Sequence, residues 1–202
     1  MAGNTITYRG IKLHPGQRRI VNEIFNNDTF YNTIVAPRQC GKSVLCYNIA
    51  LYFAINNKNV NVLWTSPTHP QSKIAMEKIY GAIKNSGIVY QYNKTERKIT
   101  LINGSTLYFT GTEKADNIRS ISTHYLIVDE CAYTDEDAVT KVLIPTMATA
   151  GRKAFFISTP RGRHNLFYKY YAYGEAKMDM YSSYRMDLLE NPFRNIELIE
   201  SE

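Results

Sequence analysis

The chain has 202 residues, of which 44% are hydrophobic and 21% charged, and these proportions exclude an intrinsically disordered chain while suiting one domain with an ample core. No apolar run approaches the roughly 20 residues that a membrane span needs, and the N-terminus lacks the apolar region of a signal peptide. Three cysteines without a Cys-x-x-Cys pair predict neither a disulfide framework nor a zinc site, and a net charge of +6 permits a nucleic-acid partner without demonstrating one.

The first part of the chain alternates between helical and extended patterns. Apolar residues at mixed three- and four-residue spacing predict helices, and short apolar or alternating runs predict strands. On these patterns we expect strands over residues 33–36 and 60–65 and helices over residues 17–25, 44–55 and 71–84.

Residues 88–110 have a different character. Three short β-prone runs, at residues 89–92, 98–102 and 106–109, are separated by turn-forming sequences. The second turn contains Asn103-Gly104, and Asn-Gly is the strongest two-residue hairpin signal because both positions tolerate a positive φ. We therefore expect a small antiparallel β-hairpin insert at this point of the chain.

Two continuous apolar runs follow, at residues 125–128 and 154–157, and such runs are typical of strands buried on both faces of a parallel sheet. Between them stand three acidic residues, which favour a helix start because the helix dipole attracts negative charge there. They are Asp135, Glu136 and Asp137. A further helix is expected after Gly162. Strands that alternate with helices predict an α/β fold with a mainly parallel sheet flanked by helices on both faces.

A phosphate-binding motif stands between the first predicted strand and the helix after it. Its eight residues are Ala36, Pro37, Arg38, Gln39, Cys40, Gly41, Lys42 and Ser43. They match G-x-x-x-x-G-K-[ST] except that alanine replaces the first glycine. Gly41 lets the backbone approach phosphate oxygens, Lys42 would bind the β- and γ-phosphates, and the Ser43 hydroxyl would coordinate Mg²⁺. Because alanine tolerates fewer backbone conformations than glycine, this motif alone leaves open a chance Gly-Lys-Ser at a helix start.

The apolar run at residues 125–128 ends in two adjacent carboxylates, Asp129 and Glu130. Opposite a phosphate loop, Asp129 would hold Mg²⁺ and Glu130 would orient and polarise the attacking water. Two acids at a strand end are otherwise a plain polar cap, but their position after the phosphate loop favours nucleotide hydrolysis. Ser158 and Thr159 follow the next buried strand, where small hydroxyl residues can sense a γ-phosphate, and an ordinary Ser/Thr-Pro strand exit is the alternative.

Together these motifs resemble the N-terminal ATPase domain of the large terminase subunit of tailed bacteriophages. The resemblance covers nearly the whole chain and rests on LHPGQ at residues 13–17, the phosphate loop, WTSPT at 64–68, IVDE at 127–130 and STPRG at 158–162. Phosphate loops of this family often lack the first glycine and carry an arginine, as Ala36 and Arg38 do here. The resemblance implies a RecA-like P-loop ATPase of the ASCE class that hydrolyses ATP with Mg²⁺ and drives double-stranded DNA into a procapsid.

The resemblance also implies roles for single residues. Gln17 would read the adenine edge, which suits an amide with both a donor and an acceptor, and an ordinary exposed glutamine is the alternative. Arg38 would contact the γ-phosphate within the subunit. Arg119 resembles the position from which some terminases supply an arginine finger to a neighbouring subunit, and a solvated surface arginine is the alternative. Ser158 and Thr159 would couple hydrolysis to movement.

For the assembly, the resemblance implies a homo-oligomeric ring at the portal vertex of the procapsid in the host cytoplasm. Its partners would be double-stranded DNA, the portal protein and the small terminase subunit, with no membrane partner. DNA would be held chiefly through its phosphates, and hence in a salt-sensitive way. We expect the ATPase domain over residues 1–180, and residues 181–202 as the start of a connector toward a C-terminal nuclease domain that this chain does not contain.

Two other functions remain open. The first motor domain of a superfamily-2 helicase or DNA translocase shares an upstream glutamine, a phosphate loop, an Asp-Glu pair and a Ser/Thr motif. A non-catalytic, nucleotide-dependent scaffold or DNA-binding module would bind without turnover. Strand separation would identify the helicase, and loss of turnover on Glu130→Ala would identify an ATPase.

Overall fold

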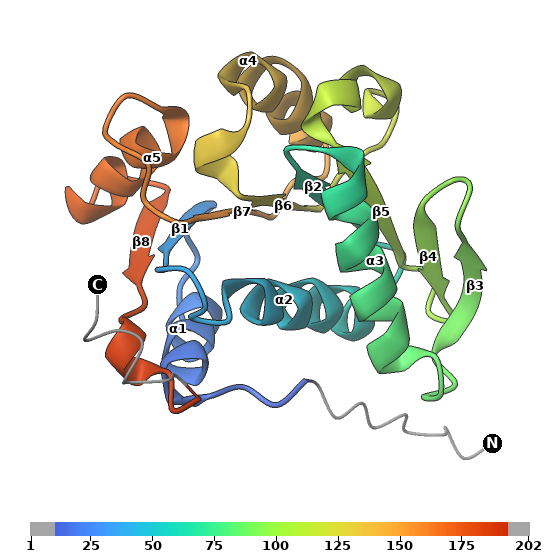
Figure 1. The fold of residues 1–202 in the computed structure, drawn as a ribbon. Helices are drawn as coiled ribbons and strands as arrows, with labels where there is room; N and C mark the ends of the chain where they lie inside the picture. Colours follow the sequence, from blue (N-terminus) through green and yellow to red (C-terminus); the bar gives the residue numbers. More distant parts are fainter. Residues whose placement is uncertain (1–10, 194–202) are drawn as a thin grey trace.

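The computed structural model describes residues 11–193, which form one eight-stranded sheet in the order β3-β4-β5-β2-β6-β7-β1-β8 (Figure 1). The strands are β1 (Tyr31–Val35), β2 (Asn61–Ser66), β3 (Val89–Asn93), β4 (Lys98–Leu101), β5 (Thr106–Gly111), β6 (Tyr125–Asp129), β7 (Lys153–Ser158) and β8 (Tyr181–Arg185). The strands from β5 to β8 across the sheet pair in parallel, which confirms the predicted α/β fold.

Helices cover both faces of this sheet. They are α1 (Pro15–Phe25), α2 (Lys42–Asn56), α3 (His69–Ile83), α4 (Glu136–Ala138) and α5 (Leu166–Glu175). The expected strands and the first three expected helices are present, with ends that differ by at most two residues from the pattern-based bounds. Within residues 11–193, no helix combines the length and the apolar character that crossing a membrane requires.

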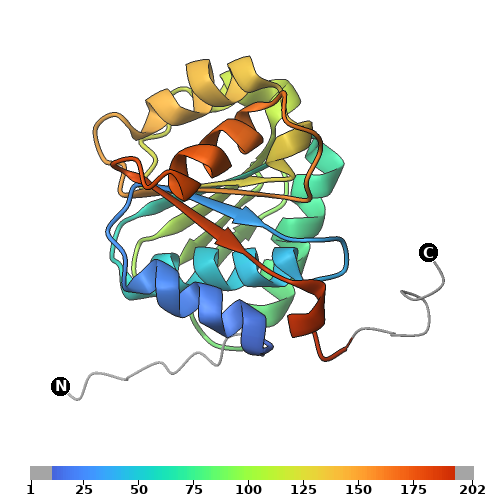
Figure 2. The same ribbon diagram turned by 90° about the vertical axis from the view of Figure 1, so that its left-hand side faces the viewer.

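The two faces of the sheet carry separate hydrophobic cores. α1, α2 and α3 pack on one face, against side chains that include Trp64 and Phe155. α5 and the segment after α4 pack on the other face, against side chains that include Leu126 and Phe156 (Figure 2). Neighbouring residues of one strand thus point into different cores, which explains the continuous apolar runs at residues 125–128 of β6 and 154–157 of β7.

The predicted antiparallel insert is an edge of the main sheet and not a separate unit. β3 pairs with β4 and β4 pairs with β5 in antiparallel fashion, but β5 pairs in parallel with β2 along six residues. The turn at Asn103-Gly104 is confirmed, with a φ of 82° at the glycine. The Asn103 side chain also donates to the carbonyls of Ala54, Ile55 and Asn57, so that the turn satisfies the last backbone acceptors of α2.

The acidic helix start is confirmed at Asp135, whose Oδ2 accepts a hydrogen bond from the Ala138 N–H at 3.0 Å. The helix that follows is irregular. After α4 it widens to π-helical turns over Val139–Leu143 and tightens to 3₁₀ turns over Ile144–Met147, where Pro145 removes a backbone donor.

The strand β8 was not expected from the sequence. It pairs in parallel with β1 over residues 181–185, and α5 packs on it so closely that a Cβ atom on Gly174 would lie 2.6 Å from the Ser182 carbonyl carbon. The domain boundary expected after residue 180 therefore falls directly before a strand of the sheet, and the sheet extends to Arg185. Residues 194–202 of the expected connector lie outside the described residues.

Candidate functional site

The predicted phosphate loop joins the end of β1 to the start of α2 at the carboxyl edge of the sheet. Gln39 and Gly41 have left-handed backbone conformations, with φ angles of 61° and 72°. A Cβ atom on Gly41 would lie 2.5 Å from Nε2 of Gln17. Glycine at this position is therefore required both by its φ angle and by the close approach of a neighbouring side chain.

Ala36, which replaces the first glycine of the motif, needs no special backbone conformation. It is fully buried, and its N–H donates to the Ser158 carbonyl at 3.2 Å, which continues the pairing of β1 with β7. The loop makes its sharp turn three residues later, at Gln39. The departure from the motif thus falls where the chain is still part of the sheet, and alanine fits there without strain.

The start of α1 holds the phosphate loop. Gln17 has 2% of its surface exposed, so it is not an ordinary exposed glutamine. Its Nε2 donates to the Gly41 carbonyl at 2.7 Å, and its Oε1 accepts from the His14 N–H at 2.9 Å. His14 is the N-cap of α1, and its Nε2 lies 3.1 Å from the Cys40 carbonyl oxygen. No role was expected for His14 from the sequence, although the N-cap and N3 positions of His14 and Gln17 form a capping box that could have been recognised.

Lys42, Glu130 and Ser158 meet at the carboxyl edge of the sheet. Lys42 Nζ lies 2.9 Å from Glu130 Oε1, and Ser158 Oγ donates to Glu130 Oε2 at 3.2 Å. The Lys42 side chain is 11% exposed and that of Glu130 28%, so the ion pair is shielded but still reached by solvent. Three motifs that are far apart in the sequence therefore converge on the Glu130 carboxylate.

The Asp129 carboxylate lies beside this cluster. Burial, followed by the nearby charge of Glu130, raises the pKa of Asp129 to about 7. β6 packs against α2, and after burial the Asp129 charge is the next cause of the raised pKa values of Cys46 and Tyr47, so this charge acts on the second turn of the helix. Ser43 precedes these residues by three and four positions, and hence lies on the same face of the helix.

Asp129 and Ser43 fit a magnesium ion. The raised pKa means that the surrounding protein leaves the Asp129 charge incompletely compensated, which a divalent cation would correct. Mg²⁺ typically takes one or two protein oxygens and completes its coordination with water and phosphate oxygens. In the part of the chain that the structure describes, no group of three or more His, Cys, Asp or Glu side chains is placed to hold a metal ion. The donor set here therefore suits an ion that arrives with a nucleotide.

A cavity of about 360 Å³ lies next to Glu130. Arg38 and Thr159 both line it, together with Thr68 of the β2–α3 connection and Gln71 of α3. The structure thus brings the loop arginine and the second hydroxyl of the Ser/Thr motif to the same cavity as the proposed water-positioning carboxylate.

Arg119 is placed differently. It is exposed and lines a second cavity, of about 500 Å³, whose other charged residues include Glu113, Asp135 and Lys141. The two cavities share Pro67 and Tyr133 in their walls, but Arg119 does not line the one at Glu130. The structure therefore does not bring Arg119 into the cluster around Lys42.

The comparisons with known proteins agree with this geometry. Residues 33–200 match the family described as terminase large subunit, T4likevirus-type, N-terminal. A terminase large subunit of Escherichia phage T5 is 33% identical to the chain over 172 residues, which are 84% of the chain and 39% of the phage protein. The chain therefore spans about two fifths of the length of that relative.

Solved structures share the fold. A large terminase ATPase domain of Thermus phage P74-26 superposes with a TM-score of 0.71 at 18% identity, over 86% of this chain and 80% of that one. The large terminase of a thermophilic bacteriophage, in complex with ATP-γ-S, gives a TM-score of 0.74 at 14% identity, over 94% of this chain and 48% of that one. The UvsW helicase of bacteriophage T4 gives a lower TM-score of 0.59 at 13% identity, over 90% of this chain and 64% of that one.

Proposed function

This chain belongs to the family of terminase large subunits of the T4-like-virus type, and from that premise we propose that it is an ATP-hydrolysing motor domain that drives double-stranded DNA into a viral procapsid. The observation that carries the proposal is the convergence of Lys42 and Ser158 on Glu130, beside a loop with the shape of an anion nest.

The residues of the cluster have separable roles. The Lys42 amine would exchange its contact with Glu130 for the β- and γ-phosphates when a triphosphate binds. Glu130 would then be held by Ser158 and would orient and polarise the attacking water. Because Ser158 belongs to β7, a shift of the Glu130 carboxylate would move a residue of the sheet through this hydrogen bond. This supports the coupling role of Ser158 and Thr159.

Nucleotide binding is supported by the complex of the similar terminase from a thermophilic bacteriophage with ATP-γ-S. The loop from Ala36 to Ser43 would surround the phosphates with the backbone N–H groups that follow Pro37, and Ser43 and Asp129 would hold Mg²⁺. The ion would supply neutralisation of phosphate charge. Gln17 would read the adenine edge with the second hydrogen of Nε2 and the second lone pair of Oε1, since one of each is already used by the protein.

Two arginines would complete the site. Arg38 lines the cavity beside Glu130, which supports a contact with the γ-phosphate from within the subunit. Arg119 lines a neighbouring cavity, outside the cluster of Lys42, Glu130 and Ser158 in its own subunit. A residue that acts on the nucleotide of the next subunit in a ring needs such a position.

The family membership also supports the wider setting. We propose a homo-oligomeric ring at the portal vertex of the procapsid in the host cytoplasm, with the portal protein and the small terminase subunit as partners. A net charge of +6 suits binding to the DNA backbone, which would be weakly sequence-selective and salt-sensitive. Residues beyond Arg185 would lead toward a C-terminal nuclease domain.

The helicase alternative is less well supported, because the family match is to terminases and the similarity to the UvsW helicase is lower. The two functions differ in what they do to a duplex. A packaging motor moves along double-stranded DNA without separating it, whereas a helicase releases single strands.

The test compares ATP binding and turnover in the wild type, Lys42→Ala and Lys73→Ala. Lys73 is an exposed lysine of α3 and serves as the matched control. We expect Lys42→Ala to lose nucleotide binding and Lys73→Ala to keep it. We also expect duplex DNA to stimulate hydrolysis at low salt, and the stimulation to fade as salt rises. Normal nucleotide binding by Lys42→Ala, or release of single strands from a duplex by the wild type, would contradict the proposal.

A further inference from the structure

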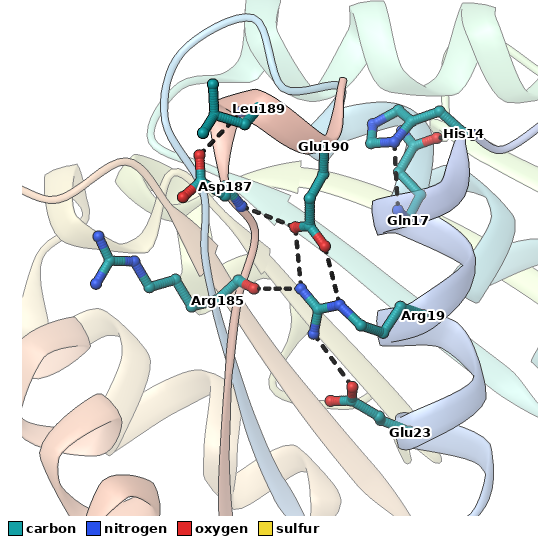
Figure 3. Close-up of polar contacts among 8 residues, drawn as sticks. All are labelled: His14, Gln17, Arg19, Glu23, Arg185, Asp187, Leu189 and Glu190. Carbon is teal, nitrogen blue, oxygen red and sulfur yellow. Dashed lines mark hydrogen bonds and ion pairs between the residues drawn. The ribbon is translucent and has the colours of Figure 1, made fainter. Parts of the chain in front are cut away.

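The segment after β8 returns to the start of α1. Met186 is fully buried, and its N–H donates to the Val35 carbonyl at the end of β1. Asp187 then caps a short 3₁₀ helix, Leu188–Glu190, by accepting from the Leu189 N–H at 2.9 Å, and its own N–H donates to Glu190 Oε2 at 2.9 Å (Figure 3). The chain therefore passes from the sheet edge to the phosphate-loop side of the domain in an ordered form.

An ion pair fixes this segment to α1. Arg19 donates to both carboxylate oxygens of Glu190, each at 3.0 Å, and to the Arg185 carbonyl at 2.8 Å (Figure 3). The paired arrangement is stronger and more directional than a single contact. The backbone of α1 also approaches the Glu190 side chain closely, because a Cβ atom on Gly16 would lie 2.7 Å from the Glu190 Cβ. Gly16 and Arg19 thus form a docking surface on α1 for Glu190.

The docked segment places Asn191 on the phosphate loop. Asn191 has 8% of its surface exposed, and its Nδ2 donates to the Gln39 carbonyl at 2.9 Å. Its Oδ1 accepts from the Phe193 N–H at 3.0 Å, so both ends of the amide are used. With His14 on Cys40 and Gln17 on Gly41, three consecutive carbonyls of the loop are each held by a side chain from outside it.

The direction of these carbonyls determines the direction of the loop's N–H groups. The chain has no cis peptide bond among its described residues, so the C=O and N–H of each peptide there point in opposite directions. Holding the carbonyls of residues 39–41 therefore turns the N–H groups of residues 40–42 toward the opposite side, where an anion can be bound. A loop that is fixed in this way loses less conformational entropy on binding a phosphate.

We propose that Asn191 is a positioning residue for the phosphate loop, held in place by the Arg19–Glu190 ion pair, so that the segment after β8 and the nucleotide bind cooperatively. This inference rests on the proposed nucleotide function. The coupling is reciprocal, because whatever tightens the loop around a nucleotide must stabilise the docked segment by the same free energy.

The test is the change in KM and kcat for ATP in Asn191→Asp. Aspartate keeps the shape and the acceptor for the Phe193 N–H but cannot donate to Gln39. The contact would position the loop equally for the bound triphosphate and for its transition state. Its loss should therefore raise KM about 3- to 10-fold while kcat stays within about two-fold. Asn103→Asp is the matched control: it also removes asparagine donations to backbone carbonyls, at the far end of α2, and should leave KM unchanged.

Two further measurements make the result decisive. Glu190→Gln should raise KM less than Asn191→Asp does, and the double variant should not exceed Asn191→Asp, because both changes release the same contact. ATP-γ-S should slow amide hydrogen exchange at residues 187–191 in the wild type and not in Asn191→Asp. An unchanged KM in both variants, with a wild type that binds and hydrolyses ATP, would overturn this inference alone. Normal nucleotide binding by Lys42→Ala would instead overturn the proposed function.

Discussion

The Ser158 hydroxyl donates to the Glu130 carboxylate at 3.2 Å and joins the ends of two adjacent parallel strands, β7 and β6. The contact gives the Ser/Thr motif a physical function, because it fixes the orientation of the carboxylate whose other oxygen is paired with Lys42. If Lys42 turns to the phosphates when a triphosphate binds, as proposed, the Ser158 contact is the one that keeps the proposed water-positioning carboxylate in its orientation.

Ser158→Ala should therefore slow hydrolysis without weakening nucleotide binding. We expect kcat to fall roughly tenfold and the affinity for ATP-γ-S to stay the same, because the lost hydrogen bond orients Glu130 and not the phosphates. Steady-state kinetics and equilibrium binding check this. Ser72→Ala, which removes another buried serine hydroxyl from a bond to the His69 carbonyl in α3, is the control and should change neither value. A parallel loss of affinity in Ser158→Ala would refute the positioning role.

The raised pKa of Asp129 predicts that its ionised carboxylate, which would bind the metal ion, lowers the stability of the metal-free fold. The folded-state pKa is about 7 and the ordinary value is 3.8, so between these pH values the folded state holds a proton that the unfolded state has lost. The stabilising effect of that proton is complete below about pH 4 and is lost as the pH rises through 7. Because one pKa unit corresponds to about 1.4 kcal/mol, metal-free Asp129→Asn should be more stable than the wild type by a few kcal/mol at pH 8.

Denaturant unfolding in EDTA at pH 4 and pH 8 checks this prediction. The advantage of Asp129→Asn should disappear at pH 4, and the same variant should lose Mg²⁺-dependent ATP hydrolysis. Asp137→Asn, at an exposed position, is the control and should show no such pH dependence. An Asp129→Asn domain that is less stable than the wild type at pH 8 would contradict the destabilising effect assigned to the buried charge of Asp129.

Gly41→Ala should damage the phosphate loop. The new Cβ would lie 2.5 Å from Gln17 Nε2, at a φ of 72°. We expect a loss of about 1–2 kcal/mol in the free energy of unfolding from the left-handed conformation alone, and at least a tenfold loss of ATP affinity as Gln17 is displaced. Thermal unfolding and nucleotide titration measure both. Gly81→Ala, in α3 with open space around the new Cβ, should instead stabilise the domain by up to about 1 kcal/mol.

Ala36→Gly restores the usual first residue of the motif and should bring no gain. Ala36 is buried and continues the pairing of β1 with β7, so the glycine would remove a packed methyl group and increase the freedom of the unfolded chain. We expect the free energy of unfolding to fall by about 1 kcal/mol, with KM for ATP within about two-fold of the wild type. A large improvement in ATP affinity would contradict the view that the turn begins at Gln39.

The parts of the fold that were predictable are those in which a local pattern and the final environment agree. β6 and β7 carry continuous apolar runs because each is buried on both faces, and the hairpin turn carries its Asn-Gly signal in two adjacent residues. β8 gave no such signal, because its sequence YSSYR is largely polar. Its place in the sheet is fixed by parallel pairing with β1, whose paired residues lie 150 positions earlier in the sequence. The antiparallel pairing of β3, β4 and β5 was predicted, but the parallel pairing of β5 with β2, which joins them to the main sheet, is a long-range contact that gave no local signal.

The same distinction holds for the site. Lys42, Asp129 and Glu130 could be proposed from the sequence, because the chemistry assigned to them demands certain residue types at strand and helix ends. His14 and Asn191 contact backbone carbonyls of residues that lie 26 and 152 positions away in the sequence. Every residue has a backbone carbonyl, so the sequence does not indicate which one a side chain will contact. Residues that act on the backbone of a motif thus become visible only when the chain is folded.

The most direct test of the account is ATP turnover in Glu130→Ala, measured together with equilibrium binding of ATP-γ-S, with Glu77→Ala at an exposed position of α3 as the control. Turnover should fall by orders of magnitude in Glu130→Ala while the nucleotide still binds, and Glu77→Ala should match the wild type. Hydrolysis at the wild-type rate in Glu130→Ala would contradict the assignment of this carboxylate, and with it the proposed chemistry of the site.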